Sequence, residues 1–318
     1  MGYGENQLMR GVILDQATLD RDDLDFSPLL ALLPEWKIYA QTHPDELDAR
    51  LDDADIILTN KVVLDRATLL RHPSIRLICV LATGTNNIDL AAAQELGITV
   101  KNVTAYGTAS VTQHVFLLIL TLARHQCGYQ NAVQQGRWQH SDQFCLLDYP
   151  IEDISGKTLG IVGYGELGKS VAATAPAFGL EVLVAERTGR PCRPGRQPLD
   201  EVLARADILT LHCPLTADTR QMINRQTLAT MKTNAWLINA ARGALIDETA
   251  LAHALDNGII AAAALDVLAT EPPPPNHPLL NKSRSNLIVT PHIAWAARTA
   301  RQRILELTCD NIQTYLTS

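Results

Sequence analysis

The 318-residue sequence has no block of lysine or arginine and no hydrophobic run long enough to span a bilayer. Its formal net charge is -7. Without a basic patch to bind a phosphate backbone, we expect no nucleic-acid partner, and we expect no membrane segment. The N-terminus MGYGENQLMR lacks the apolar core of a secretory signal and the Ser or Thr of a myristoylation signal at its sixth position. These absences predict a cytoplasmic protein.

Cysteine pairs are also missing. No CxxC motif and no histidine pair at metal-ligand spacing accompanies the six cysteines, which are Cys79, Cys127, Cys145, Cys192, Cys213 and Cys309. We therefore interpret them as reduced thiols and expect neither disulfides nor a metal site. Glycine and proline occur singly apart from PPPP at 272–275, and 47% of the residues are hydrophobic. The composition and length indicate a folded globular protein with room for two domains.

Short apolar segments alternate with helical segments in the first hundred residues. The expected strands are GVILD, WKIYA, ADIILTN, IRLICVLAT and ITVKNV, and they are separated by segments such as RATLLRH and LAAAQELG. Strands that alternate with helices pair in parallel through crossover connections, so this half of the chain predicts a small α/β domain.

A mostly apolar stretch, TASVTQHVFLLILTLARHQCGYQNAVQQ, covers residues 108–135. Thr108 or Ser110 can supply an N-cap, and neither proline nor glycine interrupts the stretch before Gly128. The pattern predicts one long helix. Because the stretch is so apolar, we expect it to be buried widely, by its own domain or by a partner subunit.

The alternation resumes after a polar connection. The expected strands are LGIVG, EVLVAE, DILTLHC, AWLINA, IAAAALDV and NLIVTPH, which match a doubly wound sheet of the dinucleotide-binding kind. The tail AWAARTARQRILELTCDNIQTYL predicts an amphipathic helix that folds back on the N-terminal domain. We expect an α/β protein with two Rossmann-like domains, in which a cofactor domain (102–292) is inserted in a flavodoxin-like substrate domain (1–101 and 293–318).

The segment LGIVGYGELGKSVA, residues 159–172, carries the GxGxxG spacing at Gly163, Gly165 and Gly168. A lone match is weak, but this one follows an apolar strand and precedes a helical segment. In that setting the first glycine permits a tight turn and the second lets the backbone approach a pyrophosphate. The third lets the helix pack closely on the strand. The motif predicts a dinucleotide site.

Glu186 ends the next expected strand, where a carboxylate can accept hydrogen bonds from the adenosine ribose hydroxyls. A carboxylate there favours NAD(H) over NADP(H), because it would repel a 2′-phosphate at close range. Four arginines follow in the same loop, at Arg187, Arg190, Arg193 and Arg196. They leave two alternatives open, a solvated basic loop or a partner for a 2′-phosphate.

Polar residues follow three later strands. Arg242 follows AWLINA, Asp266 and Glu271 follow IAAAAL, and His292 follows NLIVTP. Because ligands bind outside the carboxyl ends of the strands in an open α/β sheet, these side chains could converge on one crevice. An arginine can hold a substrate carboxylate and polarise its carbonyl, while a histidine backed by a glutamate can exchange the proton that accompanies hydride transfer. Each residue alone also has a structural interpretation, as a strand-end cap, a surface charge or a buried histidine.

These motifs resemble the D-isomer-specific 2-hydroxyacid dehydrogenase family, and most of all its glycerate dehydrogenase (hydroxypyruvate reductase) branch. The resemblance covers nearly the whole chain, through ATGTNNIDL, NVTAYGTASVTQHVFLLILTLAR, GKTLGIVGYGELG, LHCPLTADTR, LINAARGALID, AALDVLATEP and VTPHIAW. It implies a discontinuous substrate domain, a central cofactor domain and a homodimer built largely on cofactor-domain helices.

The resemblance also assigns site residues. The catalytic residues of the family fall on Arg242, Glu271 and His292. The substrate is implied to contact Arg242, His292 and the loop amides of Thr83, Gly84 and Thr85. Besides the three glycines, the implied cofactor contacts are Glu166, Leu167, Glu186, Cys213, Pro214, Thr219, Ala240, Asp266 and His292, with Cys213 and Pro214 along the adenosine and Asp266 near the nicotinamide.

The implied activity is NAD-dependent reduction of a small 2-oxo acid, with hydroxypyruvate giving D-glycerate and glyoxylate giving glycolate. Two alternatives stay open, a dehydrogenase for another 2-oxo acid and a non-catalytic NAD(H)-sensing protein that resembles transcriptional corepressors of the same fold. One departure is visible at the start of the long helix. Relatives often have a carboxylate where this chain has Gln113, in VTQH, and the sequence assigns this residue no role.

Overall fold

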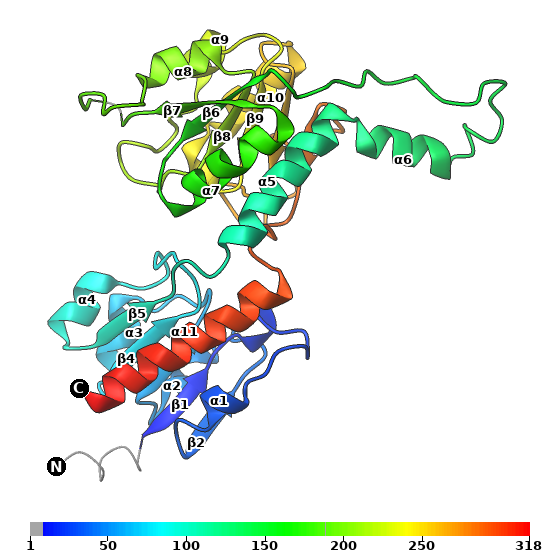
Figure 1. The fold of residues 1–318 in the computed structure, drawn as a ribbon. Helices are drawn as coiled ribbons and strands as arrows, with labels where there is room; N and C mark the ends of the chain where they lie inside the picture. Colours follow the sequence, from blue (N-terminus) through cyan, green and yellow to red (C-terminus); the bar gives the residue numbers. More distant parts are fainter. Residues whose placement is uncertain (1–8, 188) are drawn as a thin grey trace. The chain divides into compact units, whose positions relative to one another are not determined.

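The computed structural model describes residues 9–187 and 189–318, which divide into two compact units (Figure 1). The first unit holds residues 1–107 and 295–318, and the second holds 108–294. The sequence placed the domain boundaries after residues 101 and 292, whereas the two units divide after residues 107 and 294. Most of the N-terminal segment MGYGENQLMR lies outside the described residues. No helix within the described ranges is long and apolar enough to cross a membrane.

The first unit contains a parallel sheet in the order β2-β1-β3-β4-β5. Its strands are β1 (Arg10–Ile13), β2 (Glu35–Ile38), β3 (Ile56–Thr59), β4 (Leu77–Val80) and β5 (Thr99–Asn102). The helical segments between them are η2 (Gln16–Thr18), α1 (Ser27–Leu30), α2 (Leu47–Leu51), α3 (Arg66–Arg71) and α4 (Leu90–Glu95). This is the flavodoxin-like strand order, as the sequence predicted.

The C-terminal helix α11 (Arg298–Thr317) completes the first unit. Its buried residues Ile304, Leu305 and Ile312 belong to the same core cluster as side chains of β1, β3 and β4. Arg301 adds two hydrogen bonds of 2.7 Å to the carboxylate of Asp23. The tail therefore forms a helix that packs on the sheet of the first unit.

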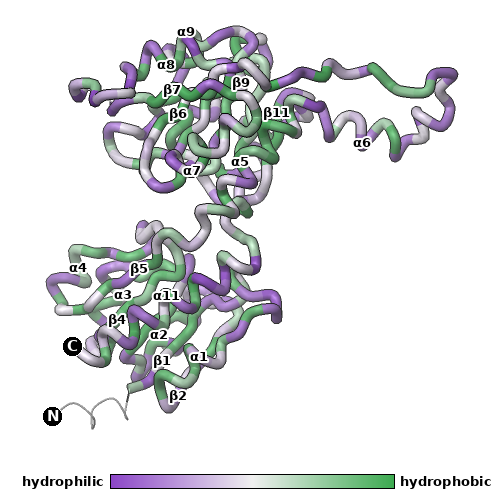
Figure 2. Tube along the Cα trace, in the orientation of Figure 1, coloured by the Kyte–Doolittle hydropathy of each residue, from purple (hydrophilic) through white to green (hydrophobic). Residues whose placement is uncertain are grey.

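The second unit contains a parallel sheet in the order β11-β10-β9-β8-β6-β7. Its strands are β6 (Thr158–Val162), β7 (Glu181–Ala185), β8 (Ile208–Leu211), β9 (Trp236–Asn239), β10 (Ala262–Leu265) and β11 (Leu287–Val289). Its helical segments are α5 (Thr108–Ala123), α6 (Gln126–Gln134), α7 (Glu166–Thr174), η3 (Ala175–Phe178), α8 (Leu199–Arg205), α9 (Arg225–Thr230), η4 (Gly243–Leu245) and α10 (Glu248–Asp256). Hydrophobic residues gather along these strands (Figure 2).

The order of the second sheet reverses at β6, because β7 lies on one side of β6 and β8 on the other. The predicted doubly wound sheet is thus confirmed. In such sheets the crevice for a ligand lies at the carboxyl ends of the strands beside the reversal. Here those ends belong to β6 and β8.

The prediction of one helix over residues 108–135 is wrong. The helix breaks between α5 and α6, where His125 adopts a left-handed backbone with φ 46°. The His125 ring stacks on Tyr149, with the ring centroids 5.9 Å apart, and the Glu152 amide donates to the carbonyl of Ala123. The returning connection after α6 therefore supplies the contacts that favour the break, and no glycine or proline marks it.

Candidate active site

The glycine loop joins β6 to the nine-residue helix α7. Gly163 has φ +99°, and a Cβ there would lie 2.4 Å from the backbone nitrogen of Cys213. A Cβ at Gly168 would lie 2.0 Å from the carbonyl oxygen of Gly163. A larger residue at Gly168 would therefore push α7 away from the end of β6. A larger residue at Gly163 would push the glycine loop away from the chain after β8.

Gly165 forms the N-cap of α7, and nothing lies within 4 Å of the Cβ that it lacks. A pyrophosphate can approach the backbone there and accept hydrogen bonds from the first amides of the helix. Glu166 and Leu167 open the helix, and the hydroxyl of Thr108 donates to the Glu166 carboxylate. The loop fits the phosphates of a dinucleotide.

The chain after β8 lies against this loop. Cys213 is half-buried, and burial raises the pKa of its thiol to about 11, so it stays a neutral thiol near neutral pH. The hydroxyl of Thr219 donates to the carbonyl of Pro214 at 2.8 Å and accepts from the amide of Thr216 at 2.7 Å. These bonds fold residues 213–219 into a compact turn beside the reversal of the sheet, where an adenosine would bind.

Glu186 follows β7 directly and is buried, with 5% of its surface exposed. Arg193 holds its carboxylate with two side-chain hydrogen bonds, from Nε at 2.7 Å and from Nη2 at 2.6 Å. Hydrogen bonds from the Arg193 side chain, followed by one from the Arg187 amide, hold the pKa of this carboxyl far below its usual range. Glu186 is therefore ionised at any physiological pH and is already engaged by the arginine-rich loop.

His292 and Glu271 meet at the carboxyl ends of β11 and β10. The Nδ1 atom of His292 lies 2.6 Å from Oε2 of Glu271, and both side chains are about one-third exposed. The second Glu271 oxygen accepts a 2.8 Å hydrogen bond from the amide of Leu268, which fixes the carboxylate. A ring held this way at Nδ1 has its orientation fixed, and Nε2 is the ring nitrogen left for chemistry.

Arg242 follows β9, whose neighbour in the sheet is β10. The adjacent Gly243 brings the two loops together, because a Cβ at Gly243 would lie 1.9 Å from the carbonyl carbon of Leu268. Arg242 is half-buried, and its Nη1 donates to the carbonyl of Ala241 at 2.7 Å. The structure thus places the guanidinium and the Glu271 carboxylate on adjoining strand-end loops.

A buried network behind His292 was not predicted from the sequence. The Thr290 hydroxyl donates to Asp266 Oδ1 at 2.5 Å, and His114 Nε2 lies 3.0 Å from the Thr290 oxygen and 3.3 Å from Asp266 Oδ1. Burial raises the Asp266 pKa, but the hydrogen bonds that its carboxylate accepts outweigh burial and lower the pKa below its usual value.

Asp266 also shapes the turn that carries His292. Its carboxylate accepts the amides of Ile293 and Ala294, and its carbonyl accepts the amide of His292 at 2.8 Å. His292 has φ +56°, a conformation that is uncommon for residues other than glycine. The network therefore stabilises the backbone that presents the ring. The apolar alternation around His114 and Asp266 gave no signal of this pairing.

The structure also describes the remaining expected contact residues, each within its own unit. Ala240 follows β9 directly and is half-buried. Thr83, Gly84 and Thr85 follow β4 in the first unit, where the carbonyl of Thr83 accepts a 2.7 Å hydrogen bond from the Asn102 side chain. Gln113 is exposed on α5.

Comparisons with known proteins bear on this geometry. Residues 116–294 match the model of the D-isomer specific 2-hydroxyacid dehydrogenase NAD binding domain. The chain is 44% identical to a glycerate dehydrogenase of Methylorubrum extorquens, over 94% of this chain and 95% of that protein. It is 38% identical to a hydroxypyruvate reductase of Blautia hydrogenotrophica, over 97% of both chains.

Among solved structures, the TT0316 protein of Thermus thermophilus superposes with a TM-score of 0.83 at 33% identity, over 97% of both chains. The glycine loop and the strand-end residues of the second unit lie within the matched NAD binding domain, and they include Glu186, Arg242, Asp266, Glu271 and His292. The chain belongs to the D-isomer specific 2-hydroxyacid dehydrogenases, a family of NAD-dependent oxidoreductases.

Proposed function

We propose that the enzyme reduces hydroxypyruvate to D-glycerate, and glyoxylate to glycolate, with NADH. The observation that carries this proposal is the His292–Glu271 pair at 2.6 Å, on strand ends that adjoin the loop of Arg242. A histidine held by a carboxylate is suited to give a proton, and an arginine is suited to bind a carboxylate. The names of the Methylorubrum and Blautia relatives support the choice of substrate.

Each residue has one task in this proposal. The guanidinium of Arg242 binds the substrate carboxylate and polarises the C2 carbonyl. His292 donates a proton from Nε2 to the carbonyl oxygen, while Glu271 holds the ring in place through Nδ1. NADH, when bound, supplies the hydride to C2. We further propose that the amides of Thr83, Gly84 and Thr85 bind the substrate carboxylate.

The substrate assignment is tested by comparing kcat/KM for hydroxypyruvate, glyoxylate, pyruvate and a branched 2-oxo acid with NADH. We expect hydroxypyruvate to be best and pyruvate to be poorer, because a site built to bind the C3 hydroxyl leaves buried polar groups unpaired when that hydroxyl is missing. Such a loss costs about 1–3 kcal/mol per group. If the branched acid has the highest efficiency, the pocket is large and apolar, and the hydroxypyruvate assignment is wrong.

Glu271→Gln should lower kcat for reduction, because it removes the carboxylate that holds Nδ1 of His292 at 2.6 Å and so orients the ring. The Kd of NADH should change little. Steady-state kinetics and a direct NADH titration of the wild type and the variant measure the two quantities. An unchanged kcat would show that Glu271 does not act through His292.

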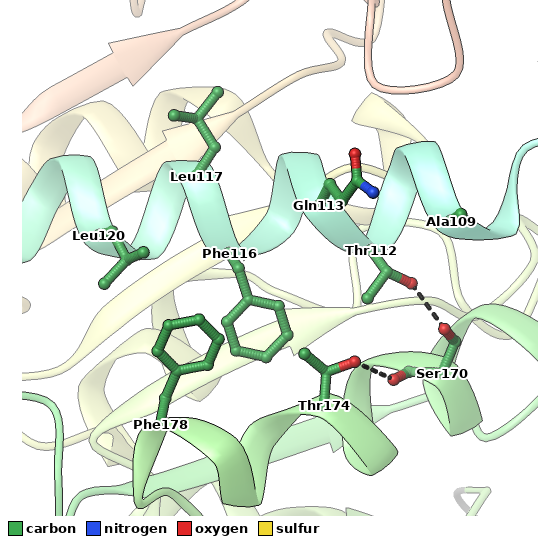
Figure 3. A pocket seen from close by; sticks show the side chains of 9 residues that line it. All are labelled: Ala109, Thr112, Gln113, Phe116, Leu117, Leu120, Ser170, Thr174 and Phe178. Carbon is green, nitrogen blue, oxygen red and sulfur yellow. Dashed lines mark hydrogen bonds between the residues drawn. The ribbon is translucent and has the colours of Figure 1, made fainter. Parts of the chain in front are cut away.

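We also propose that the enzyme is a homodimer. An apolar groove of about 580 Å³ lies between α5, α7 and η3, where Phe116 stacks on Phe178 (Figure 3). The connection after α6 projects away from the sheet of its own unit (Figure 1) and exposes 90% of Phe144 and 77% of Leu147. Exposed apolar grooves and patches on a protein surface commonly mark a site where a protein partner binds. A second copy of the chain could cover both the groove and the exposed side chains of the connection.

Sedimentation equilibrium measures the oligomeric state directly. The wild type should sediment as a dimer, and Phe144→Asp combined with Leu147→Asp should shift it towards the monomer, because each charge would be buried without a partner. The matched control is Leu70→Asp, which places the same charge on an exposed leucine of α3. A wild type that is monomeric at micromolar concentration would contradict the proposal.

For location, we propose the cytoplasm. Each of the six cysteines is a free thiol. Reducing compartments keep thiols in this state, whereas secreted proteins commonly pair them. Fractionation of source cells with an antibody against the chain would test this proposal, and recovery in a membrane or extracellular fraction would contradict it.

A further inference from the structure

The carboxylate of Glu186 has more donors than it can readily accommodate. Among the described residues, it accepts the backbone amides of Arg187 at 2.9 Å and Arg193 at 3.2 Å. It also accepts Nε and Nη2 of Arg193, at 2.7 and 2.6 Å, and Nη1 of Arg196 at 3.4 Å. A carboxylate offers about four acceptor positions. No position therefore remains for a ribose hydroxyl while Arg193 stays in place.

Of these donors, the Arg193 side chain is the one that can leave. The two backbone amides are part of the chain after β7. The Arg196 side chain is only 18% exposed, and its guanidinium lies over the Tyr164 ring, 5.5 Å from the centroid. The Arg193 side chain is 57% exposed, so it can turn into solvent without moving the backbone or a buried neighbour. Its departure would leave three donors on about four acceptor positions, which uncovers a position for a ribose hydroxyl.

A 2′-phosphate would meet the same arginine differently. While Arg193 covers Glu186, the carboxylate charge that would repel the phosphate is neutralised. A guanidinium binds phosphate through the same two-pronged geometry that it uses for a carboxylate. Because a guanidinium has five N–H donors, Arg193 could keep Nε and Nη2 on Glu186 and bind the phosphate through its other donors, so that neither anion is left without a partner.

We propose that Arg193 determines the balance between NADH and NADPH, as a competitor of the ribose hydroxyls of NADH for Glu186 and as the partner of the 2′-phosphate of NADPH. One side chain then weakens the binding of one cofactor and strengthens the binding of the other. Glu186 by itself would exclude NADPH, and with Arg193 in place the enzyme binds both.

Isothermal titration calorimetry tests the proposal by measuring Kd for NADH and for NADPH without any 2-oxo acid. The result is thus independent of the proposed substrate. In Arg193→Gln we expect the Kd of NADH to fall and the Kd of NADPH to rise, so that their ratio changes at least tenfold. Arg190→Gln is the matched control, because it removes the same charge from the same exposed loop. There the ratio should stay within threefold of the wild-type value.

Glu186→Gln should have the opposite effect, with a higher Kd for NADH and a lower Kd for NADPH. The substitution removes the charge that repels the 2′-phosphate and releases Arg193 to bind that phosphate. The thermal midpoint of each variant shows whether it is folded. A substitution that only disrupted the loop would weaken the binding of both cofactors together. The proposal is overturned if Arg193→Gln shifts both dissociation constants in the same direction or leaves their ratio within tenfold of the wild type. It is also overturned if the wild type shows no measurable NADPH binding.

Discussion

His292→Asn should lower kcat for 2-oxo acid reduction by a factor on the order of 10² or more, the usual contribution of a general acid. Asparagine tolerates the left-handed backbone that this position requires, with φ +56°, so the turn should persist while the proton donor is lost. The Kd of NADH should stay within a few-fold of wild type, because the remaining cofactor contacts are intact. Steady-state kinetics and a direct NADH titration measure the two quantities.

The matched control for this variant is His253→Asn on α10. His253 is exposed and lies in the last turn of its helix, so the same substitution there should leave kcat within about twofold. His292→Ala should lose at least as much activity as His292→Asn. Near-normal turnover in either His292 variant would remove His292 from its role as proton donor.

Arg242→Ala should lower kcat/KM for the 2-oxo acid by a factor on the order of 10³, through a higher KM and a lower kcat together. The side chain is expected both to bind the substrate carboxylate and to stabilise the negative charge that grows on the carbonyl oxygen. Removal of one preorganised donor of this kind alone costs about 10²–10³ in kcat. Arg242→Lys should be intermediate, because lysine keeps the charge but not the paired geometry.

The control for the arginine is Arg205→Ala on α8. Arg205 is half-exposed and pairs with Glu201 one helical turn away, an interaction that contributes little to stability. That variant should keep wild-type kinetics. If Arg242→Ala raises KM without lowering kcat, Arg242 binds the carboxylate but does not polarise the carbonyl. If neither constant changes by more than threefold, the residue has no part in the reaction.

The features predicted well from sequence are those that local chemistry dictates. Gly163 and Gly168 are required by contacts with neighbouring backbone, and the strand alternation around them predicted where the loop would lie. The polar residues Arg242 and His292 stand immediately after strands, where the parallel sheet brings strand ends together. For such residues the position along the chain predicts the position in space.

The features that escaped prediction depend on contacts between distant segments. The break at His125 is favoured by Tyr149 and Glu152, which return from the far end of the connection. His114 lies on α5 yet contacts Thr290, far along the chain. Hydrophobic periodicity describes one element at a time and carries no record of such pairs.

The arginine-rich loop lies between these cases. The sequence showed four arginines after Glu186 and left open whether they were solvated or bound a phosphate. The structure pairs Arg193 and Arg196 with Glu186 itself, a third arrangement. Charge patterning showed where the arginines gather, but only the fold of the loop determines which arginine reaches the carboxylate.

The most direct test of the central claim is the identity of the product when the purified enzyme is given hydroxypyruvate and NADH. We expect NADH to be oxidised in equal amount to the hydroxypyruvate consumed, and chiral chromatography should find D-glycerate as the product. Formation of L-glycerate would contradict the assigned stereochemistry. A lack of NADH oxidation with hydroxypyruvate and with the other 2-oxo acids, despite tight NADH binding, would contradict catalysis and favour an NAD(H)-sensing protein.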